Sequence, residues 1–189
     1  MMAKDSARQE RAVQRRRQIL EAARARADAE GWPAVTTRHL AAAIGFTQPV
    51  LYGHFPGGKA EIMLEVASDG FVELARRGRA TLADAEEGSA QLVEAAGIAY
   101  LDFAAEHPAV YEAMFQQPIG AEFASENTPV PLRDGFEVLR EALGDDSDGT
   151  VTEVFWGALH GISLLERAGR MRPEHRAERV RELARRFAR

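Results

Sequence analysis

Apolar residues recur every three or four positions along most of this 189-residue chain, and polar residues fill the positions between them. This spacing predicts amphipathic helices, because it gathers the apolar side chains on one helical face. No stretch shows the strict alternation that is typical of a half-buried strand. The pattern therefore predicts an all-α fold of about nine helices, preceded by a disordered polar segment in residues 1–9. The helices are expected near residues 10–30, 37–44, 47–54, 58–79, 87–107, 108–115, 131–143, 150–168 and 173–187.

Two short helices in residues 36–59 flank a turn that contains Gly45. Thr36 stands where its hydroxyl can cap the first helix, and Gly45 stands where helices end in a left-handed residue. Thr47 can cap the second helix, and Pro49 falls in its first turn, where a missing N–H costs nothing. This arrangement predicts a helix-turn-helix, a unit that places its second helix in the major groove of DNA.

Charge is distributed unevenly along the chain. The net charge is -5, yet residues 1–60 hold ten Lys and Arg against five Asp and Glu, and residues 61–189 hold fourteen against twenty-four. A basic segment attached to an acidic one indicates that only residues 1–60 meet a polyanion. A difference of this size also arises in ordinary two-domain chains, so it supports the helix-turn-helix and does not replace it.

Composition excludes several other classes of protein. The chain has no Cys, so it has no disulfide framework, no thiolate chemistry and none of the usual structural zinc sites. It lacks the GxGxxG and GxSxG motifs, and no two of its five His stand at a metal-binding helical spacing. We therefore expect no catalytic residues, no metal and no cofactor. The charged N-terminus and the absence of a membrane-length apolar run predict a cytoplasmic protein without a membrane partner.

The segment TTRHLAAAIG, followed by FTQPVLYGHF and Lys59, resembles the DNA-binding domain of the TetR family of transcriptional regulators. The preceding RRRQILEAARARADAEGW resembles the first helix of that family. Farther along, WGALHG at residues 156–161 and HPAVYEAMF resemble the C-terminal domain of a TetR subgroup named for its Trp-His-Gly residues. The resemblance implies a three-helix helix-turn-helix head in residues 1–60, and a helical-bundle body for ligand binding and dimerisation in residues 61–189.

The resemblance also places the DNA contacts, at the starts of the two short helices. The residues it implies are Thr37, Arg38, Thr47, Gln48, Pro49, Val50, Tyr52, His54 and Lys59. Their chemistry fits this role, because Arg pairs with guanine, Gln pairs with adenine, and hydroxyl and amine groups bind phosphates. For Tyr52 and His54 the alternative is that they only close the small core of the head.

A single small head buries too little surface for tight, specific binding, so we expect a homodimer that reads the two half-sites of a palindromic operator. The last two apolar helices are the predicted interface, with four of them packing across a two-fold axis. The candidate interface residues are Phe155, Leu159, Ile162, Leu165, Val180, Leu183 and Phe187. A role in the core of one chain remains open for each of them.

Members of the family typically bind a small-molecule effector in a pocket of the helical body. The effector of this chain is unidentified, and aromatic residues of the chain could line such a pocket. The candidates are Tyr100, Phe103, Met114, Phe115, Phe123, Phe136 and Trp156, with His160 as a polar group. For each of these residues an ordinary core position is an equally good interpretation.

The resulting hypothesis is a homodimeric, sequence-specific DNA-binding regulator, a repressor that a small-molecule ligand releases from its operator. The alternative is a helical small-molecule carrier or enzyme whose head does not read DNA. The match at residues 36–59 and the division of charge favour the regulator. An activator remains open.

Overall fold

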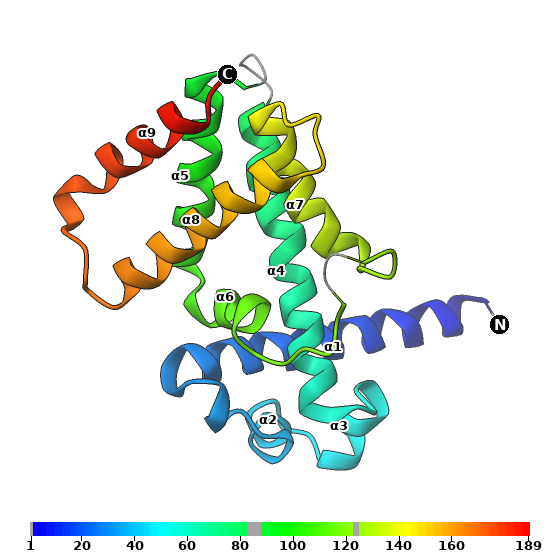
Figure 1. The fold of residues 1–189 in the computed structure, drawn as a ribbon. Coiled ribbons are helices and arrows are strands. Elements are labelled where there is room, and N and C mark those ends of the chain that lie inside the picture. The colour runs from blue at the N-terminus through cyan, green and yellow to red at the C-terminus, as the bar shows by residue number, and fades with distance from the viewer. Residues whose placement is uncertain (1, 83–87, 123–124) are drawn as a thin grey trace. The chain divides into compact units, whose positions relative to one another are not determined.

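The computed structural model describes residues 2–82, 88–122 and 125–189, with side chains from residue 6 onward. Within these residues the chain forms nine α-helices and two short 3-10 helices, η1 and η2, and no β-strand (Figure 1). This confirms the predicted all-α fold. The elements are α1 (Met2–Glu30), η1 (Trp32–Ala34), α2 (Thr37–Ala43), α3 (Gln48–His54), α4 (Gly58–Leu82), α5 (Ala90–Glu106), α6 (Pro108–Phe115), α7 (Val130–Leu143), α8 (Thr150–Arg167), η2 (Pro173–His175) and α9 (Arg176–Phe187).

The chain divides into two compact units. The first contains Met1–Ser68 and Pro108–Ala121, and the second contains Asp69–His107 and Glu122–Arg189. Helix α4 begins in the first unit and ends in the second, while α6 belongs to the first. The predicted boundary between residues 60 and 61 concerns function, and it stays a prediction beside this geometric division.

The core of the first unit forms around α1. Ile19, Leu20, Ala23 and Ala27 are buried, and their spacing places them on one face of the helix. Trp32 is also buried, and its indole N–H donates to the backbone oxygen of Ala109 in α6 at 2.8 Å. This bond satisfies the polar atom of a side chain that is otherwise enclosed by apolar groups.

Helix α1 begins earlier than the apolar pattern predicts. It starts at Met2, whereas the pattern predicts a start near residue 10 after a disordered segment, so the prediction for residues 2–9 was wrong. From residue 6 to residue 18 no side chain is buried, and the buried residues begin at Ile19. A helical segment without a buried face leaves no apolar periodicity, which is why sequence reasoning missed it.

Local chemistry explains most of the helix-turn-helix. The hydroxyl of Thr36 accepts a hydrogen bond from the backbone N–H of His39 at 3.2 Å, and Gly45 has a φ of 71°. Pro49 lies in the first turn of α3. These three predictions are confirmed. The expected side-chain cap at Thr47 is wrong, because its hydroxyl makes no capping bond to α3.

Helix α5 is central in the second unit, where it packs against α7, α8 and α9. The buried aromatic residues Tyr100, Phe103 and Phe155 fill this core. Gly78 of α4 faces Val138 of α7, and a Cβ at Gly78 would lie only 2.3 Å from the Cγ1 atom of Val138. The close approach of α4 to α7 therefore requires a glycine at this position.

The acidic turn before α8 stabilises the start of that helix. One carboxylate oxygen of Asp145 accepts hydrogen bonds from the backbone N–H and hydroxyl of Ser147, at 3.1 and 2.5 Å. The other accepts from the backbone N–H and hydroxyl of Thr152, at 3.2 and 2.7 Å. Hydrogen bonds from Ser147 and Thr152 to the charged form hold the pKa of Asp145 well below its usual range. The turn thus holds an ionised carboxylate at the N-terminus of α8, where the helix dipole favours it.

Candidate functional site

The outward surface of α2 and α3 carries most of the residues predicted to contact DNA. Leu40 and Leu51 are buried, which orients the polar sides of both helices toward solvent. Arg38, Thr47, Gln48, Pro49 and Tyr52 are exposed there, and Thr37 and Val50 are half-buried. We call these seven residues the reading surface.

Three side chains of the reading surface form a chain of polar contacts between the two helices. The amide nitrogen of Gln48 donates to the hydroxyl of Thr37 at 3.3 Å. The same hydroxyl lies 3.5 Å from the hydroxyl of Tyr52, a residue that is 46% exposed. The start of α3 is therefore tied to the start of α2, which reduces the ordering cost when a ligand binds.

Arg38 is the free cation of the reading surface. It is exposed, and it makes neither an ion pair nor a hydrogen bond with any residue that the structure describes. Its guanidinium can therefore form a bidentate pair with the O6 and N7 atoms of guanine without first breaking an internal contact.

His54 and Lys59 differ from the reading surface, because both lie in an internal network of the first unit. Arg16 of α1 donates to the backbone oxygen of His54, and its guanidinium lies 4.1 Å from the ring centre of Phe55. Burial, followed by the charges of Arg15 and Arg16, lowers the pKa of His54, so its imidazole is neutral at neutral pH.

The ammonium of Lys59 donates to the backbone oxygen of Trp32 at 2.5 Å. A phosphate contact from Lys59 stays a prediction, and it would have to share this donor group with that carbonyl. The sequence gives no sign of the bond, because the two residues lie far apart along the chain.

The predicted dimer interface is divided by the structure into two faces. Phe155, Leu159 and Val180 are at most 2% exposed in the single chain, so they have almost no area to offer a partner. Leu165 is exposed, and Ile162, Leu183 and Phe187 are half-buried. Sequence reasoning missed the exposed apolar residues Val151 and Val154 of α8. Their spacing of three residues was the signal that could have found this second face.

The predicted effector residues fall in both units. Met114 and Phe115 belong to the first unit, and Phe123 lies outside the described residues. The other five belong to the second unit, and they are Tyr100, Phe103, Phe136, Trp156 and His160. The structure therefore brings part of the predicted set into one unit.

Trp156 connects three of the helices in that set. Its indole N–H donates to the hydroxyl of Tyr100 at 3.1 Å, and its ring meets that of Phe136 edge to face at 6.4 Å between centres. His160 lies one turn farther along α8. Burial lowers the pKa of its imidazole, which favours the neutral form at neutral pH. These groups combine aromatic rings with a few polar atoms, which is the side-chain chemistry that small-molecule sites use.

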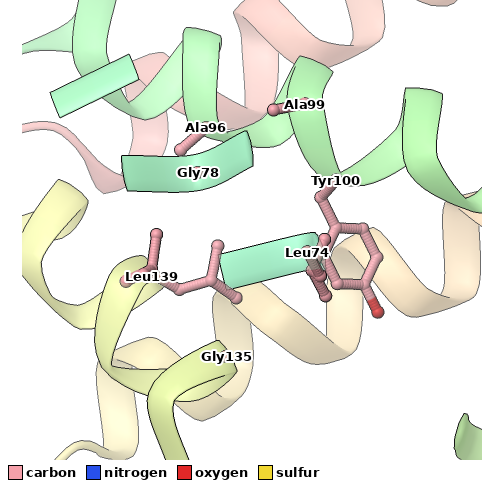
Figure 2. Close-up of a pocket in the computed structure, with 8 residues that line it drawn as sticks. Leu74, Gly78, Ala96, Ala99, Tyr100, Gly135 and Leu139 are labelled. Atoms are coloured by element: carbon pink, nitrogen blue, oxygen red, sulfur yellow. The ribbon is translucent and has the colours of Figure 1, made fainter. Parts of the chain in front are cut away.

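A small cavity lies beside Tyr100, between α4, α5 and α7 (Figure 2). Its lining residues are Leu74, Gly78, Ala96, Ala99, Tyr100, Gly135, Val138 and Leu139. Its volume of about 10 Å³ holds at most one water molecule. In the described part of the chain, no three acidic or histidine side chains gather closely enough to hold a metal ion.

Two family descriptions match the chain, and together they span most of it. "Bacterial regulatory proteins, tetR family" matches residues 19–66, and "Tetracyclin repressor-like, C-terminal domain" matches residues 93–188. The uncharacterized HTH-type transcriptional regulator Rv0681 of Mycobacterium tuberculosis is 31% identical over 165 residues, which cover 82% of this chain and 72% of the relative. The chain belongs to the TetR family of transcriptional regulators.

Solved structures share the fold of this TetR-family chain. The putative regulatory protein SCO4313 has a TM-score of 0.72 at 21% identity, and the match covers 95% of this chain and 97% of the SCO4313 chain. The TetR family transcriptional regulator PfmR from Thermus thermophilus has a TM-score of 0.64 at 24% identity, covering 89% and 97%. A protein of unknown function from Rhodococcus sp. RHA1 has a TM-score of 0.70 at 20% identity, covering 92% and 95%.

Membership assigns this TetR-family chain to transcription regulation through a DNA-binding domain in its N-terminal part. Regulators of this family are non-enzymatic DNA-binding proteins, so the chain is not an enzyme. In the described ranges, no helix combines the length and apolar character needed to cross a membrane.

Proposed function

We propose that this chain is a cytoplasmic homodimeric repressor, which binds a palindromic operator and leaves it when a small-molecule effector binds. The observation that carries the proposal is the reading surface. It combines a guanidinium at Arg38 that has no partner among the described residues with a Gln48 amide that is already held beside Thr37. These are the side chains that distinguish guanine and adenine in the major groove.

The exposed face of α8 supports assembly into a dimer. Val151, Val154 and Leu165 are 42%, 59% and 41% exposed, which is unusual for apolar residues on one helix of a monomer. Gly157 and Gly161 lie between them with no atom near the position of a Cβ, so a second helix can approach closely. A face of this kind is self-complementary when two copies meet across a two-fold axis.

The aromatic cluster around Trp156 supports an effector site in the body. The hydroxyl of Tyr100 accepts a hydrogen bond from the indole of Trp156, whose ring meets that of Phe136, and His160 lies one turn farther along α8. The cavity beside Tyr100 is too small for an effector at about 10 Å³. An effector that binds beside Tyr100 therefore has to select a more open body, and this preference is what would shift the two heads to a spacing that no longer fits the operator.

The first test is a selection of binding sites from a random double-stranded DNA pool at near-physiological salt. The proposal expects a palindrome with two half-sites, because each protomer of a dimer reads one. Gln48→Ala should relax the preference at one base pair in each half-site, at a cost of about 1–3 kcal/mol on the preferred site. Gln91→Ala is the matched control, since Gln91 is exposed on α5. Recovery of no preferred sequence by the wild type would overturn the proposal.

Assembly is tested separately by sedimentation. Val154→Glu should convert the dimer to a monomer, because a carboxylate would be buried without a partner in the interface. Val72→Glu is the control, since Val72 of α4 is 54% exposed and lies outside the proposed interface. A wild type that sediments only as a monomer would refute the dimer and leave the reading surface to be judged by the DNA selection.

A further inference from the structure

The N-terminal half of α1 is a largely solvated helix, and its described part meets the rest of the first unit through the guanidinium groups of Arg15 and Arg16. The whole helix has 29 residues, and from residue 6 to residue 18 it contains no buried side chain. Figure 1 shows this half projecting past α3 toward the N-terminus. Helices that are polar all round are marginal in water unless something else stabilises them. Contacts within the first unit therefore do not account for this half of the helix, whereas a binding partner outside the unit would.

Three arginines share one face of this half. Arg8, Arg11 and Arg15 follow one another at intervals of three and four residues, so they lie in one row along the helix. We call this row the arginine stripe. Arg11 and Arg15 are like charges four residues apart, a pair that weakens a free helix by a few tenths of a kcal/mol. Arg8 and Arg11 are exposed and make no ion pair with any residue described in the structure.

Neighbouring arginines on other faces of α1 are neutralised. Arg17 pairs with Glu21 at 2.8 Å, and Arg16 pairs with Glu65 of α4. Among the residues whose side chains the structure describes, the lack of carboxylate partners for the arginine stripe is therefore a property of that face and not of the whole helix. An unneutralised row of cations favours a polyanion as its partner.

Arg15 fixes the direction in which the stripe points. Its guanidinium lies 5.2 Å from the ring centre of Phe46, which stands in the turn between α2 and α3. Phe46 comes two residues before Gln48 of the reading surface. The stripe thus leaves the head on the side of the recognition helix and continues roughly 10 Å outward from Arg15 to Arg8.

We infer that the arginine stripe binds the sugar-phosphate backbone of the duplex beside the half-site, outside the bases that α3 reads. This inference rests on the proposed function and extends the DNA-contacting surface beyond the helix-turn-helix. Duplex DNA presents one charge per about 1.7 Å of its axis, so a row of this length meets several phosphates. Such contacts add affinity without adding sequence preference.

The test compares the salt dependence of binding for an Arg8→Ala/Arg11→Ala variant and the wild type. The probe is the duplex recovered by the wild type, prepared with flanks and trimmed to the half-sites. On the flanked duplex the slope of log affinity against log salt should fall by about 0.9 for each lost contact, close to 2 per protomer. On the trimmed duplex the two proteins should bind alike.

The matched control is Arg185→Ala/Arg186→Ala, which removes the same charge from α9, where both arginines pair with Glu182. Its slope should match that of the wild type. Arg8→Lys/Arg11→Lys should keep the wild-type slope, which shows that any loss comes from charge and not from unfolding of the helix.

Each outcome decides a different claim. An unchanged slope in the Arg8→Ala/Arg11→Ala variant, or a difference that persists on the trimmed duplex, would overturn the stripe while leaving the proposed function intact. A wild type that binds duplex without sequence preference, with a slope that still depends on Arg8 and Arg11, would sustain the stripe and refute the proposed operator. Absence of duplex binding at any salt would refute both.

Discussion

Helices α1 and α9 are both rich in arginine, but they use it differently. In α9, Arg176 pairs with Asp102 and Arg179 pairs with Glu166, each at 2.7 Å. In α1, Arg8 and Arg11 have no such partner among the described residues. The number of arginines therefore does not decide which helix meets a polyanion. The two sets differ in whether a carboxylate of the same helix or of another element reaches the guanidinium group.

This difference assigns separate tasks to the two sets of arginines. A paired guanidinium covers apolar surface with its methylene groups while its charge is cancelled locally. An unpaired one keeps its charge, so it can release counterions from DNA when it binds a phosphate. We expect mutations in the first set to change stability and mutations in the second to change DNA affinity.

The largest expected effect lies on the reading surface. Arg38→Ala should cost about 1–3 kcal/mol of binding on the preferred duplex and relax the preference at one base pair, because a bidentate contact to guanine is lost. Urea denaturation should show unchanged stability. Arg133→Ala is the control, since Arg133 of α7 is also exposed and unpaired within the described chain. A loss of affinity without any change in base preference would make Arg38 a phosphate contact.

Arg176→Ala should have the opposite signature. It removes the pairs with Asp102 and Glu166, so the free energy of unfolding should fall by about 1–2 kcal/mol. Larger losses are not expected, because the side chain of Arg176 is 33% exposed and solvent screens it. The affinity for DNA at fixed salt should not change. Arg170→Ala, at an exposed residue whose side chain has no partner in the described ranges, should change stability by no more than about 0.5 kcal/mol.

Arg16 tests the boundary between the two sets, because it is a paired arginine inside the head. It contacts the backbone oxygen of His54, the ring of Phe55 and the carboxylate of Glu65. Arg16→Ala should weaken DNA binding by about 1 kcal/mol, because α3 loses a contact that positions its end. The salt slope should stay the same, since no phosphate contact is removed. A slope lower by about 1 would instead identify Arg16 as a phosphate ligand.

The smallest expected effect is a dependence of stability on pH. Hydrogen bonds from Arg76 and then Arg77 lower the pKa of Glu73 to about 2. Because the pKa of Glu73 is depressed in the folded protein, ionised Glu73 contributes its full stabilisation above 4.5, the pKa of the unfolded chain. This stabilisation is lost as the pH falls from 4.5 toward 2. Because Glu73 is 34% exposed, solvent screening limits the loss to less than about 1 kcal/mol. Urea midpoints between neutral pH and about pH 3 should fall less steeply for Glu73→Gln than for the wild type. Parallel curves would contradict the role of Glu73.

The sequence by itself determined the helical class and most of the helix-turn-helix. The spacing of Ile19, Ala23 and Ala27 predicts the buried face of α1, and Thr36 and Gly45 mark the start and end of α2. These features depend on residues within one or two turns of each other, so the local sequence contains all the information that they need. The resemblance to the TetR family rests on the same local segments.

The tertiary structure alone decided which side of each helix remains free. It buries Phe155 and Leu159 and exposes Val154, although all three are apolar residues of α8. It also ties the ammonium of Lys59 to Trp32, a residue of a different element. Burial and pairing depend on neighbours that are distant along the chain, and each contact competes with solvent only after the fold has brought the two groups together.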